Sequence, residues 1–332
     1  MVFVQIIIGG ITRLTGSGLS ITKWEIVTGT LPPLNERSWQ QEFDLYKATP
    51  QYQKINKGMS LDEFKFIYFW EYFHRLWARL MGFVFAIPFV FFWLKNYFDE
   101  LLKKRLIIIF LLACLVASFG WIMVASGLVE RPWVNAYKLT LHLGLALFLY
   151  AYLLWTALLV SFNRKYLAIS NGVKKLGKFL LVLLAVQLFL GGLMSGMKAG
   201  LFYPTWPKMG DAWIPQVIMN FYEWKLEDLT LYDSKPFAVA QVQFFHRLFA
   251  YLLSVLIIIY YFRIKDLQLP AIKHLLPVAV LAQVIIGIIT VINCKATIPV
   301  FWGVLHQGMA IVLLSVLLSV IYFSEKNRNV AA

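Results

Sequence analysis

The chain has 332 residues, of which 60% are hydrophobic and 14% are charged, and its mean hydropathy is +0.69. This composition excludes an ordinary soluble domain, in which about 25% of residues are charged. A net charge of +14 would favour a nucleic-acid partner in a soluble protein. Here the basic residues lie in loops between apolar runs, so we expect a lipid bilayer around the protein and no nucleic acid.

Eight apolar runs predict an all-α polytopic membrane protein with eight transmembrane helices. The first run, residues 1–11, is short, because it covers about 16 Å of a hydrocarbon core about 30 Å thick. We therefore expect that the natural start lies upstream or that something else completes this helix, and we do not interpret it as a signal peptide. The other predicted spans are 64–94, 105–128, 138–160, 177–197, 237–262, 272–292 and 300–323.

Loop charges predict the orientation of these spans. The connections near residues 95–105, 164–178 and 263–273 are short and basic, as is the C-terminal tail. They alternate with connections of mixed charge, so the positive-inside rule places the basic set and both termini in the cytoplasm. Without transit-peptide features, the membrane is predicted to be the bacterial inner (plasma) membrane. The connections predicted to lie outside are 12–63, 129–137, 198–236 and 293–299.

The two halves of the chain repeat each other. Three short motifs recur in the same order at offsets of 182, 172 and 164 residues, which predicts two pseudo-symmetric four-helix bundles of the same orientation. We expect an N-terminal half at residues 1–163 and a C-terminal half at residues 164–332. The paired motifs are Gly9–Thr12 with Gly191–Met194, Glu71–Leu76 with Gln243–Leu248, and Leu141–Gly144 with Leu305–Gly308.

Four of the five histidines lie at repeated positions: His74, His142, His246 and His306. All four are predicted near the outer edge of the hydrocarbon core, where ionisable groups usually face the bundle interior. A zinc or copper site would need a further carboxylate or thiolate ligand, whereas a haem iron needs two axial imidazoles from facing helices. The pairs His74/His142 and His246/His306 therefore favour one haem in each half over simple helix–helix hydrogen bonds.

The remaining candidates are interpreted more simply. His274 has no repeat partner and lies at a cytoplasmic loop end, so we expect an ordinary interface residue. Cys114 and Cys294 form no CxxC pattern, which favours packing roles. Arg75 and Arg247 directly follow two of the haem-site histidines, and their guanidinium groups could pair with haem propionates or extend to the membrane surface.

One repeated position differs between the halves. Glu71 precedes His74 by three residues, and Gln243 precedes His246 by three residues. Residues at this spacing share a helix face, so the first half places a carboxylate beside its predicted iron site. A carboxylate there can accept a proton, orient water or stabilise a developing cation, unless Glu71 only pairs with Arg75 or Lys65. The contrast predicts chemistry in the first half and a resident cofactor in the second.

Several long stretches resemble the haem A synthase family, which oxidises haem O to haem A for cytochrome oxidase. The resemblance covers essentially the whole chain and is closest to the mitochondrial and proteobacterial branch. Some family members carry cysteine pairs in the outer loops, and the segments 12–63 and 198–236 contain none. The matching stretches are Gly9–Ser20, Leu31–Asn35, Asn56–Ser60, Glu63–Ile67, Glu71–Arg75, Gly196–Gly200 and Tyr203–Met209.

The resemblance implies a resident haem b between His246 and His306, substrate haem O between His74 and His142, and Glu71 as the catalytic carboxylate. It also implies haem O synthase and an electron acceptor or donor as partners, and it leaves open whether the chain forms a homo-oligomer. Two other functions are compatible with the residues. A dihaem electron-transfer protein would use both histidine pairs without catalysis, and a transporter would need helices interrupted at the bilayer midplane.

Overall fold

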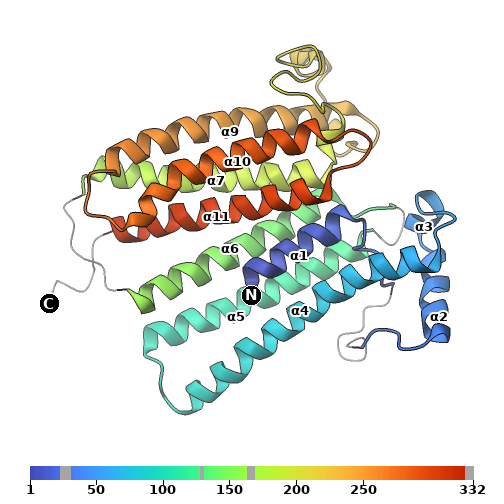
Figure 1. The fold of residues 1–332 in the computed structure, drawn as a ribbon, viewed down its shortest axis with the longest axis horizontal. Coiled ribbons are helices and arrows are strands. Elements are labelled where there is room, and N and C mark those ends of the chain that lie inside the picture. The colour runs from blue at the N-terminus through green and yellow to red at the C-terminus, as the bar shows by residue number, and fades with distance from the viewer. Residues whose placement is uncertain (23–30, 128–130, 163–168, 326–332) are drawn as a thin grey trace. The chain divides into compact units, whose positions relative to one another are not determined.

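A computed structural model describes residues 1–22, 31–127, 131–162 and 169–325, and Figure 1 shows its helices in chain order. Among these residues, seven helices are long and apolar enough to cross a membrane. An eighth apolar helix, α1 (Val2–Leu14), has 13 residues. The prediction of an all-α polytopic membrane protein is therefore confirmed. The long helices are α4 (Leu61–Leu94), α5 (Glu100–Ala125), α6 (Ala136–Ser161), α7 (Asn171–Gly196), α9 (Pro236–Ile264), α10 (Leu275–Ile292) and α11 (Val300–Ser324).

Local sequence signals explain where several of these helices begin. At the start of α4 the Ser60 hydroxyl accepts a hydrogen bond from the Glu63 amide, and the Glu63 carboxylate accepts one from the Ser60 amide. This reciprocal arrangement satisfies backbone donors that a helix N-terminus otherwise leaves unpaired. Asp99 caps α5 by accepting a hydrogen bond from the Leu102 amide. Helix α9 begins with Pro236, whose missing N–H costs nothing in a first turn.

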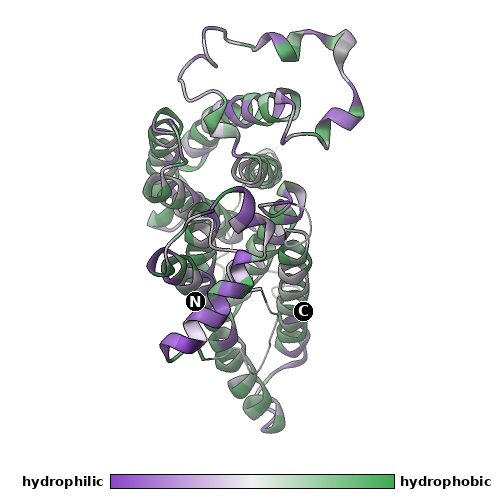
Figure 2. Ribbon diagram, turned by 90° about the vertical axis from the view of Figure 1, so that its right-hand side faces the viewer, coloured by the Kyte–Doolittle hydropathy of each residue, from purple (hydrophilic) through white to green (hydrophobic). Residues whose placement is uncertain are grey.

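The long helices present large hydrophobic side chains to their surroundings. Figure 2 shows hydrophobic residues along their lengths. On α4, for example, Phe83 is 63% exposed and Ile87 is 66% exposed. Exposed apolar side chains at this density would be unfavourable in water but are expected in contact with lipid. The chain is an integral membrane protein.

The described chain divides into two compact units, Met1–Ala146 and Leu147–Ala332. The boundary predicted after residue 163 falls in a segment outside the described residues, and it stays a prediction. In the second unit, α7 packs on α9, α9 on α10, α10 on α11, and α11 on α7, so the four helices close into a ring. Inside this ring the buried side chains of Tyr260 on α9 and Ile321 on α11 lie against Gly177 of α7.

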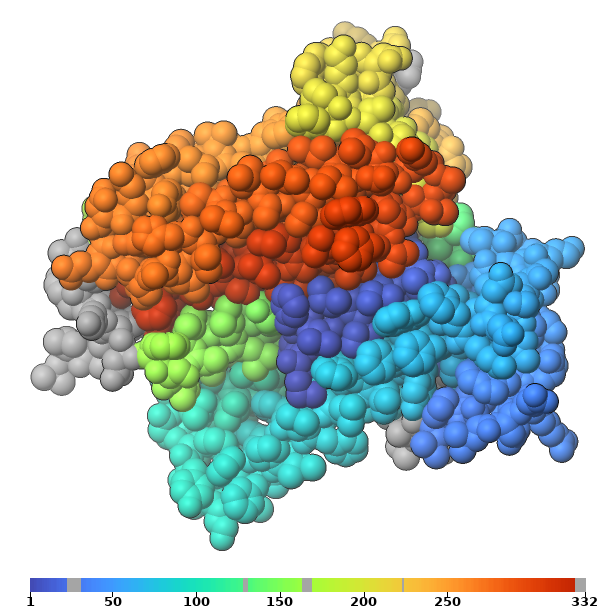
Figure 3. All heavy atoms as spheres, viewed as in Figure 1, coloured from blue at the N-terminus to red at the C-terminus, as the bar shows by residue number. Residues whose placement is uncertain are grey.

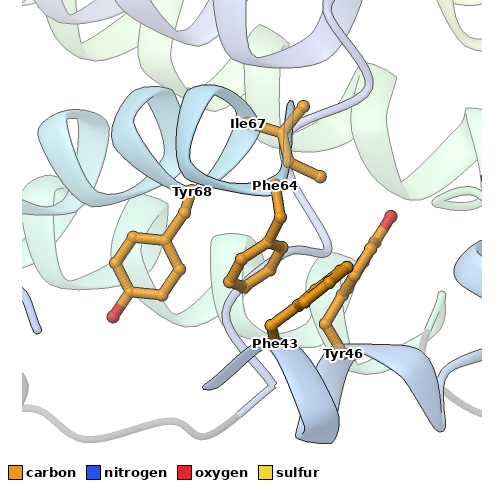
Figure 4. Packing of buried hydrophobic residues seen from close by; sticks show 5 residues of the cluster. All are labelled: Phe43, Tyr46, Phe64, Ile67 and Tyr68. Atoms are coloured by element: carbon orange, nitrogen blue, oxygen red, sulfur yellow. The ribbon is translucent and has the colours of Figure 1, made fainter. Parts of the chain in front are cut away.

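The first unit carries a folded segment before α4 that the sequence pattern did not predict. In it, α2 (Glu36–Lys47) and α3 (Pro50–Lys54) pack together, and α2 packs on the beginning of α4. Five side chains, Phe43, Tyr46, Phe64, Ile67 and Tyr68, form the buried core of this contact (Figure 4), which we call the aromatic cluster. The cluster fixes the segment to the end of α4 that precedes Glu71 and His74.

The corresponding segment of the second unit is folded differently. It contains short helices at Ala199–Leu201, Gln216–Met219, Phe221–Glu223 and Leu226–Leu229. Figure 3 shows this part of the chain, in yellow, standing out from the helix ring. Lys235 forms an ion pair with Asp228 at its end, and this hydrogen bond raises the pKa of the lysine above its ordinary value.

Candidate functional site

The second unit brings one predicted histidine pair together. His246 lies on α9 and His306 on α11, and their ring centroids are 6.4 Å apart with ring planes at 75°. Because a metal–imidazole bond is about 2.0–2.1 Å long, two imidazoles at this separation leave room for a metal ion bound by one nitrogen of each ring. The donor type and the separation of this pair therefore fit a haem iron held between two imidazoles.

The first unit places His74 on α4 and His142 on α6. The Nδ1 atom of His142 lies 3.0 Å from the carbonyl oxygen of Val116 on α5. Because a carbonyl can only accept, Nδ1 carries the proton in this contact, and Nε2 is left with the lone pair that a metal needs.

Each of the histidines His74, His246 and His306 contacts a glutamine from a neighbouring helix, and none of the three glutamines was predicted as a site residue. The amide Nε2 of Gln5 lies 3.1 Å from Nδ1 of His74. The same distance is 3.1 Å for Gln187 with His246 and 3.2 Å for Gln283 with His306. Their spacing was visible in the sequence, because each glutamine precedes a glycine by four residues within an apolar run.

Glu71 is buried, and its carboxylate is held by the loop that follows α1. The Oε2 atom accepts hydrogen bonds from the Ser20 amide at 2.7 Å, the Ser20 hydroxyl at 2.8 Å and the Ile21 amide at 2.9 Å. The other oxygen, Oε1, pairs with Arg75. Of the two alternatives predicted for an ion pair, Arg75 is the partner, whereas Lys65 pairs with Asp62. The carboxylate is thus oriented by groups from two parts of the chain.

In the second unit, Gln243 contacts the equivalent loop as a hydrogen-bond donor, whereas Glu71 contacts its loop as an acceptor. Its Nε2 donates a hydrogen bond to the Tyr203 carbonyl at 2.9 Å. Arg247 donates to the carbonyls of Tyr203, at 3.1 Å, and Thr205, at 2.7 Å. Since Ile21 and Tyr203 are 182 residues apart, the first repeat offset relates the two loops. The loop offers two backbone N–H groups to Glu71 in one unit and one carbonyl oxygen to Gln243 in the other.

Outside the histidine pairs, no larger ligand set occurs in the described ranges of the chain. In these ranges no three or more His, Cys, Asp or Glu side chains converge on a point that could hold a metal ion. Cys114 and Cys294 are free thiols, and burial raises the pKa of the Cys294 thiol. His274 lies 3.0 Å from the Tyr261 hydroxyl, which is an ordinary surface contact.

Comparison with known proteins identifies the family. Residues 1–318 match the model of the cytochrome oxidase assembly protein family, COX15-CtaA. The chain belongs to this family. Several proteins named haem A synthase are similar to this chain along most of their own length. They include proteins from Parvibaculum lavamentivorans (42% identical, covering 95% of this chain and 89% of the relative), Nitrosomonas eutropha (41%, 94% and 87%) and Flavobacterium johnsoniae (37%, 95% and 92%).

The predicted family is confirmed, and the roles of individual site residues in this cytochrome oxidase assembly protein stay predictions. The structure brings Glu71 and Arg75 into direct contact on α4 and gives each histidine a polar partner on a neighbouring helix. Arg247 is bound to loop carbonyls. The predicted pairing of Arg75 and Arg247 with haem propionates therefore requires these guanidinium groups to share their donors with the loops.

Proposed function

We infer that this membrane protein is a haem A synthase, which oxidises the ring methyl of haem O to a formyl group and so supplies haem A for cytochrome oxidase. The observation that carries this conclusion is the similarity to proteins of that name along 94–95% of the chain. The activity is that of an oxidoreductase acting within the membrane. It agrees with histidine pairs suited to haem iron in a chain of apolar helices.

We propose that the two histidine pairs have different tasks. His246 and His306 hold a resident haem b, and their ring separation of 6.4 Å supports this assignment. When bound there, such a haem takes up and passes on single electrons. His74 and His142 bind substrate haem O, because the carboxylate of Glu71 occurs only in their half of the repeat. Arg75 and Arg247 hold the propionates of the two groups.

Glu71 is proposed as the catalytic carboxylate. Conversion of a methyl to a formyl group removes two hydrogen atoms and adds one oxygen atom, so protons must leave the site. The carboxylate is oriented by Ser20, Ile21 and Arg75, and it lies one helical turn from His74 on the same face of α4. A buried carboxylate in this place can take up a proton released near the iron ligand and transfer it toward the loop.

We further propose the setting of the reaction. The protein lies in the bacterial plasma membrane with both termini in the cytoplasm and the haem sites near the outer face, because the short connections that are basic alternate with connections of mixed charge. Haem O synthase supplies the substrate, and an electron acceptor or donor exchanges electrons with the resident haem.

The experiment that tests this function is haem extraction and mass analysis from cells with and without the gene. Cells lacking the gene are expected to accumulate haem O and lose haem A, and a plasmid copy should restore haem A. If haem A is unchanged in the deletion strain, the protein is a dihaem electron-transfer protein, the alternative in which Glu71 serves only to anchor the loop.

A further inference from the structure

Every haem-site histidine rests against a glycine of a neighbouring helix. A Cβ atom added to Gly287 would lie 2.7 Å from Cε1 of His306, and one added to Gly120 would lie 3.0 Å from Cε1 of His142. The same distance would be 3.1 Å for Gly9 with His74 and 3.5 Å for Gly191 with His246. Real Cβ atoms essentially never approach another heavy atom within 3.0 Å, so an alanine in place of Gly287 would require the His306 ring to move.

The residue four positions before each glycine faces the same ring. On three helices it is a glutamine, whose amide contacts the ring nitrogens. On α5 it is Val116, and its main-chain oxygen makes the contact with His142. Residues four apart share a helix face, so each glycine and its preceding residue form one surface against the imidazole. We call this surface the cradle, and its members are Gln5 with Gly9, Val116 with Gly120, Gln187 with Gly191, and Gln283 with Gly287.

An iron-bound histidine needs a partner for its other ring nitrogen. When Nε2 binds the metal, Nδ1 carries a proton, and a hydrogen-bond acceptor then fixes the ring orientation and raises the basicity of the ligand. Val116 supplies such an acceptor through its carbonyl. On the other helices the side-chain oxygens of the three glutamines are buried and have no hydrogen-bond partner within the described ranges. In this structure the amide nitrogen, which can only donate, faces each of these three rings. A half-turn of the amide about its last bond exchanges the two atoms and places the unpartnered oxygen against the ring, as a protonated Nδ1 requires.

We propose that the cradles are positioning elements for the four haem ligands. The glycine leaves the space that the imidazole occupies. The residue four positions earlier provides the acceptor for Nδ1–H, through the main-chain oxygen at Val116 and, once the amide has turned, through the side-chain oxygen at the three glutamines. This inference rests on the proposed assignment of the histidines as axial ligands and adds residues that act through them. For His306 the positioning residues are Gly287 and Gln283. Among the four glycines, Gly287 makes the closest approach to its histidine ring.

A purely structural role predicts a different outcome. Gly177 on α7 is a packing glycine, since an added Cβ there would meet Tyr260 at 2.9 Å and no histidine. If Gly287 served only helix packing, its replacement would lower stability and leave the haem that remains bound unchanged. If it positions His306, the apoprotein tolerates alanine because a free imidazole can turn aside, whereas the haem-bound ring cannot.

The test uses purified full-length protein carrying Gly287→Ala, with Gly82→Ala as the matched control in a membrane helix, because an added Cβ at Gly82 meets nothing within 4 Å. The measurements are haem content per protein, the absorbance spectrum and the midpoint potential of the resident haem. We expect Gly287→Ala to bind haem about 10- to 100-fold more weakly and to shift the midpoint potential of the remaining haem. Gly191→Ala should change haem binding and the midpoint potential less, because its added Cβ would lie at an ordinary contact distance of 3.5 Å from Cε1 of His246.

Two further variants keep the outcomes distinct. Gln283→Leu retains the helix and most of the side-chain volume but removes the acceptor, so it should shift the midpoint potential even if Gly287→Ala fails to accumulate. His306→Ala tests the ligand assignment itself. If His306→Ala retains the wild-type haem spectrum, the proposed function of the pair is wrong. If His306→Ala loses the haem while Gly287→Ala and Gln283→Leu match Gly82→Ala, only the cradle proposal is overturned.

Discussion

The two units use the same repeat in different ways. In the second unit, α7, α9, α10 and α11 close into a ring around buried side chains, and Gln243 donates a hydrogen bond to its loop. In the first unit, α1 packs along α4, α5 makes few close approaches to its neighbours, and Glu71 accepts hydrogen bonds from its loop. A closed ring suits a cofactor that stays, and a less tightly packed set of helices suits a substrate that enters and a product that leaves.

The contrast also concerns charge. Both positions are buried, with Glu71 3% exposed and Gln243 fully buried. A buried carboxylate is expensive unless it is paired and hydrogen-bonded, and the first unit provides a loop and an arginine for that purpose. The structure therefore stabilises a buried carboxylate in only one half of the repeat, which is the observation behind the proposed catalytic role of Glu71.

The largest effect is expected from exchanging the two side chains. Glu71→Gln should reduce haem A formation by about 10²–10⁴-fold, because it removes the group proposed to take up the proton, while haem remains bound at both sites. The matched variant Gln243→Glu should leave more activity than Glu71→Gln does. Haem analysis of membranes from a deletion strain expressing each variant provides the measurement. Normal haem A with Glu71→Gln would remove the catalytic role.

A second large effect separates the resident site from the substrate site. His246→Ala should abolish the absorbance of the resident haem in purified protein, because one of its two iron ligands is lost. His142→Ala should keep that absorbance and lose haem A formation. Difference spectra of the purified variants, normalised to protein, make the comparison. Equal loss of the resident haem in both variants would contradict the division of tasks between the halves.

A smaller effect tests the difference in packing. Gly177→Ala should destabilise the second unit by about 1–3 kcal/mol, because the added methyl overlaps the buried Tyr260 in a close-packed ring. Gly82→Ala in α4 should be neutral or stabilise the protein by up to about 1 kcal/mol, since alanine is the better helix former. Thermal unfolding in detergent, followed by circular dichroism, gives both values. If the two variants unfold at the same temperature, the helices of the ring are packed no more tightly around Gly177 than the chain is packed around Gly82.

Much of the membrane fold could be predicted because apolar runs are long and unambiguous. The predicted spans 237–262 and 300–323 correspond to helices at 236–264 and 300–324. The helices α2 and α3 were not predicted, since the segment 12–63 is polar and has no long hydrophobic period. Their starts were nevertheless marked, because Asn35 and Thr49 cap them with side-chain hydrogen bonds.

The candidate site was predicted less completely. Histidines stand out in apolar helices, so all four could be located from the sequence. The repeat also predicted the proximity of His246 and His306, whose rings the structure places together. The loop donors of Glu71 could not be predicted, because Ser20 lies 51 residues away in sequence and only the folded chain brings it to α4. The glutamines were overlooked because a single amide in an apolar run carries little information by itself. Their spacing to a glycine, repeated in three helices, is the signal that identifies them.

The smallest effect concerns the folded segment that precedes α4 in the first unit. Tyr46 in the aromatic cluster is fully buried, donates to Gln51 at 3.1 Å and accepts from Asn56 at 2.8 Å. Burial raises the pKa of its phenol from 10.0 to about 12. Because the folded-state pKa is the higher one, the stability that the neutral phenol contributes is complete below pH 10 and is lost as the pH rises toward 12.

Tyr46→Phe should remove this pH dependence and cost about 1 kcal/mol at neutral pH. Hydrogen exchange of residues 36–56 between pH 9 and 12 measures it, with Tyr97→Phe at an exposed position as the control. An unchanged alkaline profile in Tyr46→Phe would assign the pH dependence to another group.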